Sequence, residues 1–381
     1  MSKKKELVSG MPEDMYFGPV FDEKEVEAVS EVIRSGRITQ LSSGVVREFE
    51  GAFAEYVGAK EAVAVNSGTA SLQTVLAACD IGPGDEVIVP AFTFIGTVGP
   101  VLQQGAIPVF ADIDPESYCL SAEDAANKIT PQTKAIMPVD IFGHPADLDP
   151  IREVAEKNGV LFIEDACQAH GAKYKDKRVG GLAKATCYSF QESKNMTTGE
   201  GGMITTNDAE LAEACREIRH QGERKWGLIG RLGYNYRMTA LQAAIGLVQL
   251  GKLDKFNDIR RQIAATYSEA LGDLNVQVPK EKPYVWSVFH VYSFLLPKEL
   301  APRRDEIVEA LRRARVPIGV AYPRPLYASP LFKNLTGPFN CPVTEDICSR
   351  VLSLPTYQSI SMDLAQEIGA VTRDILAEYV K

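Results

Sequence analysis

Between residues 61 and 207 the sequence alternates short apolar runs with segments of helical periodicity. The apolar runs, rich in β-branched residues, cover 62–65, 86–90, 107–113, 135–139 and 160–163. Continuous apolar runs of this length indicate strands that are buried on both faces, because a strand with one wet face alternates apolar and polar residues. Helical patterns that begin at about 69, near 96, after 121 and at 149 separate these runs. We therefore predict an α/β fold with a mostly parallel sheet flanked by helices.

The rest of the chain has the pattern of a second, smaller unit. Residues 239–271 read as one long helix with a single apolar stripe, which indicates one buried face. Beyond it come a strand pattern at 290–296, a helical pattern at 304–313, an apolar segment at 316–321 and a closing helix at 362–380. We predict a large domain over residues 1–254 and a small α+β domain over residues 255–381, connected by the long helix.

Composition and charge narrow the classes of function. The 41 basic and 50 acidic residues give a net charge of −9 without a long basic run, so the electrostatic signature of a nucleic-acid binder is missing. The apolar runs are far shorter than the roughly 18 residues that span a bilayer, and the first residues lack the apolar region of a signal peptide. Seven cysteines without CxxC spacing favour reduced thiols over disulfides or a zinc site. We expect a cytoplasmic protein that acts on small molecules, without a nucleic-acid or membrane partner.

Ligands of an open α/β sheet bind beyond the carboxyl ends of the strands, so the residues after each strand are candidate site residues. The run 62–65 is followed by a small polar turn, 66–71, which includes Gly68 and Thr69 and leads directly into a helix. Free backbone N–H groups and the helix dipole favour a phosphate at such a turn. Serine and threonine before a helix also serve simply as N-caps, and both interpretations stay open for this segment taken alone.

Acidic and amide side chains follow the strand at 160–163. Asp165 in this position stays charged only if it has a cationic or hydrogen-bonding partner, and a helix N-cap is the other interpretation of it. Gln168 lies in the same run. We expect Cys167 to pack as a small hydrophobe instead of acting as a nucleophile, and His170 to orient the loop instead of transferring protons.

Two further junctions carry a lysine and an aromatic ring. Lys194 comes after a strand that ends at Ser189, and the glycine-rich loop 197–202 follows it. Lysine is usually a solvated surface charge, but a lysine lodged at a sheet edge can lose its proton and become a nucleophilic amine. Phe94 follows the strand at 86–90 and could cover a flat ligand; packing in the core is the other interpretation.

Together, the four junctions offer a phosphate cradle, a carboxylate, an amine and an aromatic plate at one edge of a sheet. Pyridoxal 5'-phosphate (PLP) needs all four features, because its phosphate, pyridine nitrogen, aldehyde and ring each require a partner. A nicotinamide dinucleotide fits less well, because no GxGxxG turn follows the first strand. The Gly-Pro-Gly turn at 82–84 also lacks the Gly-Lys-Ser/Thr of a P-loop.

Four motifs in order resemble the sugar aminotransferases of the DegT/DnrJ/StrS type, which are PLP enzymes of fold type I. The motifs are NSGTA at 66–70, IEDACQAHG at 163–171, SF at 189–190 with KNMTTGEGG at 194–202, and GYNYRM at 233–238. The resemblance extends from about residue 23 to the last helix. Members with histidine at the position of Lys194 are dehydratases, so the lysine here favours transamination.

The resemblance implies a role for each matching residue and a homodimer with shared active sites. Lys194 would carry the cofactor as a Schiff base and move the proton, and Asp165 would pair with the pyridine nitrogen. The remaining implied contacts are Gln168 with the ring 3-hydroxyl, Phe94 over the ring, Gly68, Thr69 and Ser189 with the phosphate, and Asn235 with the phosphate of the neighbouring subunit.

These features predict an aminotransferase that works by a ping-pong mechanism. By resemblance, its donor is glutamate and its acceptor is a keto sugar linked to a nucleotide. Two alternatives stay open, a keto-cyclitol aminotransferase and a non-catalytic PLP-binding regulatory protein. Tyr327 stands where members that act on nucleotide sugars often have the histidine of Pro-Leu-His, so it either contacts the sugar or only packs. The sequence leaves open which sugar, nucleotide and carbon atom are used.

Overall fold

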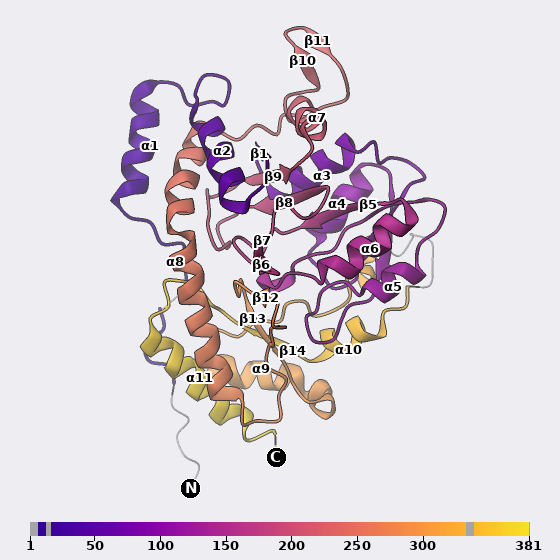
Figure 1. Ribbon diagram of the computed structural model, residues 1–381. Coiled ribbons are helices and arrows are strands. Elements are labelled where there is room, and N and C mark those ends of the chain that lie inside the picture. Colours follow the sequence, from indigo (N-terminus) through magenta and orange to yellow (C-terminus); the bar gives the residue numbers. More distant parts are fainter. Residues whose placement is uncertain (1–6, 13–16, 333–338, 381) are drawn as a thin grey trace.

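A central sheet organises the larger part of the molecule (Figure 1). The computed structural model describes residues 7–12, 17–332 and 339–380. Within these ranges seven strands pair in the order β1-β9-β8-β5-β4-β2-β3. β9 is antiparallel to both of its neighbours, and the other pairings are parallel, so the predicted, mostly parallel α/β sheet is confirmed. The strands are β1 (Glu61–Val65), β2 (Glu86–Pro90), β3 (Ile107–Ala111), β4 (Thr133–Ile136), β5 (Leu161–Asp165), β8 (Ala185–Ser189) and β9 (Gly202–Thr206).

Two of the predicted strands are too long at their carboxyl ends. β3 ends at Ala111 and β4 at Ile136, whereas we predicted strands to residues 113 and 139. Ile113 and Val139 are buried and each makes an isolated β-bridge. These two residues are apolar because their positions are buried, not because they belong to a regular strand. The apolar pattern therefore continues past the end of each strand.

Helices cover both faces of the sheet because successive strand residues point to opposite sides. Val63 and Val65 of β1 pack in the core on one face of the sheet, and Ala62 and Ala64 pack with α2 on the other face. The first face carries α3 (Gly68–Ala78), α4 (Ile95–Gln103) and α7 (Ala209–Arg219). The second face carries α2 (Val45–Val57), α5 (Ala122–Asn127) and α6 (Leu148–Asn158).

The carboxyl-terminal part forms its own hydrophobic core around a two-stranded antiparallel ladder. Its main elements are β13 (Tyr292–Leu295), α9 (Arg304–Arg313), α10 (Pro342–Arg350), β14 (Val351–Leu354) and α11 (Met362–Leu376). The long helix α8 (Ala240–Leu271) runs from the sheet into this second core (Figure 1). The boundary that we predicted at 254/255 falls inside this helix, and the division into domains stays a prediction.

The structure also contains elements that we did not predict. The amino-terminal helices α1 (Glu23–Ser35) and α2 precede the sheet, and α1 packs against α8. The short strands are β6 (Lys173–Tyr174), β7 (Lys177–Arg178), β10 (Glu223–Lys225), β11 (Leu228–Ile229) and β12 (Val285–Trp286). The 3₁₀ helices are Ile141–Gly143, Lys298–Arg303, Leu326–Ala328 and Pro330–Phe332. Among the described residues, no helix combines the length and apolar character that crossing a bilayer requires.

Helix α8 packs closely on α2 at a glycine. A Cβ atom on Gly246 would lie 2.6 Å from Cζ of Phe49. The Phe49 ring in turn lies 5.3 Å, between centroids, from the ring of Phe190, the residue that follows β8. The spacing of α2 and α8 therefore affects the end of a central strand.

We predict that Gly246→Ala lowers the melting temperature, because the new methyl group forces the Phe49 ring or the helix to move, at a cost of about 1–3 kcal/mol. Gly251→Ala is the matched control in the same helix, since its Cβ meets no atom within 4 Å. There the better helix propensity of alanine should stabilise by about 0.5–1 kcal/mol. Thermal unfolding checks both variants, and an equal gain in both would contradict the close packing.

Candidate active site

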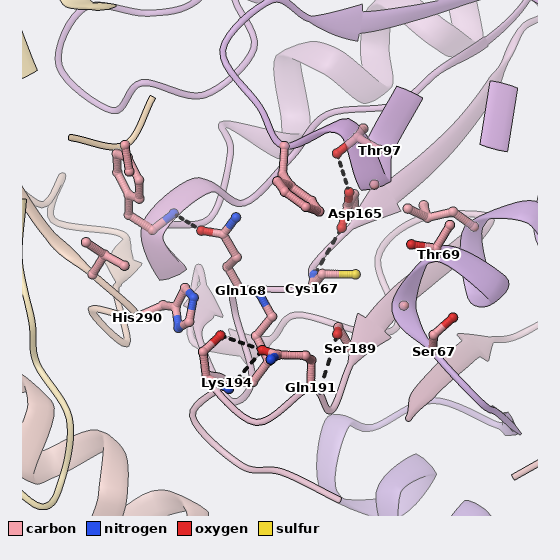
Figure 2. A pocket seen from close by; sticks show the side chains of 18 of the residues that line it. Ser67, Thr69, Thr97, Asp165, Cys167, Gln168, Ser189, Gln191, Lys194 and His290 are labelled. Atoms are coloured by element: carbon pink, nitrogen blue, oxygen red, sulfur yellow. Dashed lines mark hydrogen bonds between the residues drawn. The ribbon is translucent and has the colours of Figure 1, made fainter. Parts of the chain in front are cut away.

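A cavity of about 490 Å³ opens at the carboxyl edge of the sheet. It is lined by residues that follow β1, β2, β5 and β8, the four junctions that the sequence indicated. Figure 2 shows their side chains converging on one space. The predicted residues that line it are Gly68, Thr69, Phe94, Asp165, Gln168, Ser189 and Lys194.

Asp165 ends β5 and is 3% exposed. One carboxylate oxygen, Oδ2, accepts a hydrogen bond of 2.8 Å from the Thr97 hydroxyl, and Oδ1 accepts one of 3.1 Å from the backbone N–H of Cys167 (Figure 2). Each carboxylate oxygen therefore has a donor, and the two hydrogen bonds fix the orientation of the side chain. The chain after Asp165 continues into turns, not a helix, so the N-cap interpretation is wrong.

The N-terminus of α3 meets Ser189 and Cys167 at the cavity wall. Ser67 caps the helix, because its hydroxyl accepts a 3.1 Å hydrogen bond from the N–H of Ala70. Gly68 is the first residue of the helix, and a Cβ atom there would lie 2.6 Å from Cβ of Ser189 and 2.9 Å from Sγ of Cys167. The N-cap interpretation is confirmed, and the helix start also presents backbone N–H groups beside Ser189, which is compatible with the predicted anion site.

Lys194 reaches the cavity from a loop that the protein holds firmly. Its backbone N–H donates to the carbonyl of Gln191 at 2.9 Å, and the Thr198 N–H donates to the carbonyl of Phe190 at 3.0 Å. Burial lowers the pKa of the Lys194 amine, while Cys167 and Asp165 act in the opposite direction. The amine is therefore easier to deprotonate than a surface lysine, as a nucleophile or proton carrier requires.

Phe94 and Gln168 both line the cavity, but the Phe94 ring is exposed and the Gln168 side chain is buried. Phe94 is 58% exposed while lining the cavity, so packing in the core is the wrong interpretation for this ring; Phe92 fills that role. The carboxamide of Gln168 is held at both ends. Its Oε1 accepts from the N–H of Phe142 at 2.9 Å, and its Nε2 donates to the Tyr322 hydroxyl at 3.4 Å.

Several residues that line the cavity were not identified from the sequence. Thr97 lies one helical turn after Thr93, and their hydroxyls are 2.8 Å apart, so this pair after β2 was a signal that we could have used. His290 and Tyr322 come from distant parts of the sequence and reach the cavity through the tertiary fold alone. Ser67, Cys167, Gln191, Ser193 and Glu200 lie in the segments after strands that the sequence had singled out, although no role was predicted for them at the site. The other lining residues that were missed are Leu72, Gly96, Phe142, Val291 and Ala321.

Two predicted residues lie outside the cavity lining. Asn235 is exposed, and its carbonyl accepts a hydrogen bond from the Asn66 amide at 3.4 Å, so its suggested role in a neighbouring subunit stays a prediction. Tyr327 donates to a carboxylate oxygen of Glu345 at 2.7 Å, and its ring packs against Phe110 and Phe339. In the single chain Tyr327 is thus a packing residue.

The remaining reactive side chains near the site are held in neutral forms. Burial lowers the pKa of His170 to about 3, and the charge of Lys194 acts in the same direction. The ring packs against Tyr188 and Phe190. Burial also raises the pKa of the Cys167 thiol well above its usual value, which favours packing over nucleophilic chemistry. No group of described side chains could hold a metal ion.

These residues fit PLP. The cradle beside Gly68 has no room for a larger side chain and presents a helix N-terminus, as a phosphate requires. The Asp165 carboxyl, held by two donors at the cavity wall, suits a protonated pyridine nitrogen, and the Lys194 amine suits an aldehyde. Gly68, Thr69 and Ser189 would hold the phosphate, and Phe94 and Gln168 would contact the ring.

Comparisons with known proteins agree with this geometry. A pleiotropic regulatory protein of Geobacillus stearothermophilus is 40% identical over 90% of this chain and 92% of its own length. GDP-perosamine synthase of Caulobacter vibrioides is 39% identical over 96% of this chain and 99% of its own. The structure of Helicobacter pylori PseC, an aminotransferase involved in the biosynthesis of pseudoaminic acid, superposes with a TM-score of 0.90 at 29% identity, covering 95% of this chain and 99% of that one.

The family model of the DegT/DnrJ/EryC1/StrS aminotransferases matches residues 19–373. This range contains the sheet, the cavity and nearly all of the carboxyl-terminal core. The chain belongs to the DegT/DnrJ/EryC1/StrS family of aminotransferases, whose cofactor is pyridoxal 5'-phosphate.

Proposed function

We propose that this aminotransferase moves an amino group from glutamate to a keto sugar that is linked to a nucleotide. The observation that carries the proposal is the convergence of Lys194, Asp165 and the Gly68 cradle on one cavity. The Caulobacter relative, which is similar over nearly its full length, bears a name that refers to a GDP-linked sugar. That relative supports the substrate class, and the family resemblance supports glutamate as the donor.

The side chains divide the chemistry between them. PLP, when bound, supplies an electron sink for the carbon that exchanges its amino group. Asp165 would hold a proton at the pyridine nitrogen, because two donors fix its oxygens and the side chain is 3% exposed. The Lys194 amine takes the proton from the α-carbon of glutamate in the first half of the reaction. In the second half it gives a proton to the sugar carbon that receives the amino group. A positioned acid–base group of this kind contributes about 10²–10⁴-fold to the rate.

One relative is named as a regulatory protein, which keeps a non-catalytic function as the competing proposal. A regulatory protein that only senses PLP does not need an amine and a carboxylate prepared for proton transfer. Lys194 with its lowered pKa and Asp165 with two donors are both present, and they support catalysis. No feature of the cavity specifically favours a keto-cyclitol.

The decisive experiment uses the enzyme in its aminated form. Purified protein is first converted with glutamate, and a panel of GDP-, UDP- and dTDP-linked keto sugars is then tested for return of the aldehyde form, which absorbs in the visible range. We expect at least one nucleotide-linked keto sugar to react, and free keto sugars and keto-cyclitols to react poorly. Failure of conversion by every amino donor would support the regulatory function instead.

We also propose a cytoplasmic location. All seven cysteines are unpaired in the structure, and three of them, Cys187, Cys215 and Cys341, are fully buried thiols. Free thiols in this number are typical of a reducing compartment.

We predict that Asp165→Asn keeps the cofactor but loses transamination by about 10²–10⁴-fold, because an amide cannot stabilise a positive charge on the ring nitrogen. Single-turnover conversion by glutamate measures the loss, and absorbance measures the cofactor content. Asp149→Asn, which changes a carboxylate outside the cavity lining, is the control and should react like the unmodified protein. Equal rates in both variants would show that Asp165 has only a structural role.

We predict that Gly68→Ala weakens PLP binding by about tenfold or more, since the added methyl group displaces Ser189 or Cys167 from the phosphate cradle. Titration of the apoprotein with PLP, followed by absorbance, gives the dissociation constant. Gly99→Ala is the matched control, because its Cβ meets no atom within 4 Å. An unchanged dissociation constant in Gly68→Ala would place the phosphate elsewhere.

We propose further that the active sites are shared in a homodimer. The residues that line the cavity in one chain include Lys194 as a cation but no arginine among those described, although glutamate and a nucleotide sugar are anions. Asn235 lies outside the cavity lining on an exposed loop, near Arg231 and Arg237. A second chain that presents this loop would add the missing polar and cationic groups.

The shared site predicts complementation between inactive variants. In a mixed dimer of Lys194→Ala with Asn235→Ala, one site carries both defects and the other carries neither. Two preparations that are weak alone should therefore gain activity, up to about half per mixed dimer, after dissociation and reassembly. If mixed dimers are verified by mass and no activity returns, Asn235 serves its own subunit.

A further inference from the structure

His290 lines the cavity together with Lys194 but has no role in the chemistry described so far (Figure 2). We propose that His290 is a positioning residue whose Nε2 accepts a hydrogen bond from the Lys194 amine and so fixes the direction of that amine whenever it is free. The inference rests on the proposed aminotransferase function and concerns the amine that carries its proton.

A chain of buried hydrogen bonds determines where the proton of His290 lies. The Asn257 amide nitrogen donates to the carbonyl of His170 at 2.8 Å, which can only accept, so the Oδ1 of Asn257 faces the other way. That oxygen accepts from Nδ2 of Asn195 at 2.8 Å, and the same Nδ2 donates to the carbonyl of Val288 at 3.1 Å. The orientation of both amides is therefore fixed, because each nitrogen faces an acceptor.

The last member of this series of hydrogen bonds is the imidazole ring of His290. The Oδ1 atom of Asn195 lies 3.2 Å from Nδ1 of His290. Since Oδ1 can only accept, Nδ1 must carry the proton. A neutral imidazole has a single N–H, so Nε2 is left with a bare lone pair. Asn195 is fully buried, and the ring itself lines the cavity, so Nε2 is the nitrogen available to a group inside the cavity.

The surroundings keep the imidazole neutral. Burial lowers the pKa of His290 well below its usual value, and the positive charges of Lys194 and Arg260 act in the same direction, as does His170. Arg260 is itself buried and donates to the carbonyl of His290 at 3.2 Å. A neutral ring with its proton on Nδ1 cannot donate from Nε2 to a substrate carboxylate or phosphate. Nε2 is therefore suited to accept a hydrogen bond from a donor.

Lys194 is a donor in the cavity whose amine has no hydrogen-bond partner of its own among the described residues. The Gln168 amide nitrogen donates to Tyr322, and the Ser193 hydroxyl donates to Gln191 at 2.7 Å. The Nζ atom of Lys194 makes no hydrogen bond within the described ranges, and its charge acts on His290. Lys194 and His290 are also linked through the backbone, because the residue that fixes the ring, Asn195, directly follows the lysine.

The first test uses the unmodified apoprotein. The chain has four histidines, so ¹⁵N-labelled histidine gives a spectrum that single substitutions can assign. We expect His290 to show a protonated Nδ1 and an unprotonated Nε2 at neutral pH, and we expect the Nε2 shift to change in Lys194→Ala. A proton on Nε2, or a Nε2 shift that Lys194→Ala leaves unchanged, would overturn the proposal without any variant of His290.

The second test measures the pKa of the Lys194 amine in apoprotein variants, from the pH dependence of its acylation followed by peptide mapping. His290→Asn keeps a donor near the position of Nδ1 but removes the acceptor at Nε2. Loss of an acceptor for the ammonium should lower the Lys194 pKa by about one unit. His290→Gln, which places an amide near the position of Nε2, should recover part of the shift, and His144→Asn should leave the pKa unchanged.

This readout separates the proposal from the proposed function. The pKa of the amine is measured without cofactor or sugar, so it does not depend on which substrate the enzyme uses. A Lys194 pKa in His290→Asn that equals the pKa in unmodified protein would overturn the role of His290, even if the variant lost activity. If His290→Asn raised only the KM for the sugar, the ring would contact the substrate and not the lysine.

Discussion

The site depends on the Asp165 carboxylate, which lies at the end of β5 and is 3% exposed. Asp165 has donors on both oxygens, and two more buried carboxyls, Asp140 and Glu164, lie close enough to affect one another. Burial raises the pKa of Glu164 to about 7 and the pKa of Asp140 well above its usual value, so the pair is suited to sharing a proton. The fold thus buries three carboxyls close together, and of these only Asp165 lines the cavity.

Close contacts between backbone segments bring the partners of Asp165 together. Gly68 packs against Ser189 and Cys167, and Gly202 packs against the carbonyl of Ser67. Because β9 is inserted antiparallel between β1 and β8, these glycines draw the turn after β1 and the end of β8 into one wall. The proposed phosphate cradle is therefore a product of sheet order, and residues more than a hundred positions apart build this wall.

The sequence was informative where chemistry follows a strand and uninformative where tertiary packing decides. Asp165, Lys194 and Gly68 could be predicted, because parallel strands deliver their carboxyl ends to the same edge. His290 and Tyr322 could not, since no local pattern records that the carboxyl-terminal core approaches this edge. The predicted boundary at 254/255 ran into the same difficulty, because helical periodicity continues without a break through a helix that serves two cores.

That helix also explains how the carboxyl-terminal core can affect the lysine. One turn of α8 carries Asn257, which holds the Asn195 amide beside Lys194, and Arg260, which holds the carbonyl of His290. Arg260 also donates to Gln358 at 2.9 Å, and its hydrogen bonds in the described structure all go to neutral groups. A buried cation with neutral partners is costly, and burial lowers its pKa to about 10. The same guanidinium joins the His290 backbone to the segment before α11, so the carboxyl-terminal core is tied directly to a residue of the cavity wall.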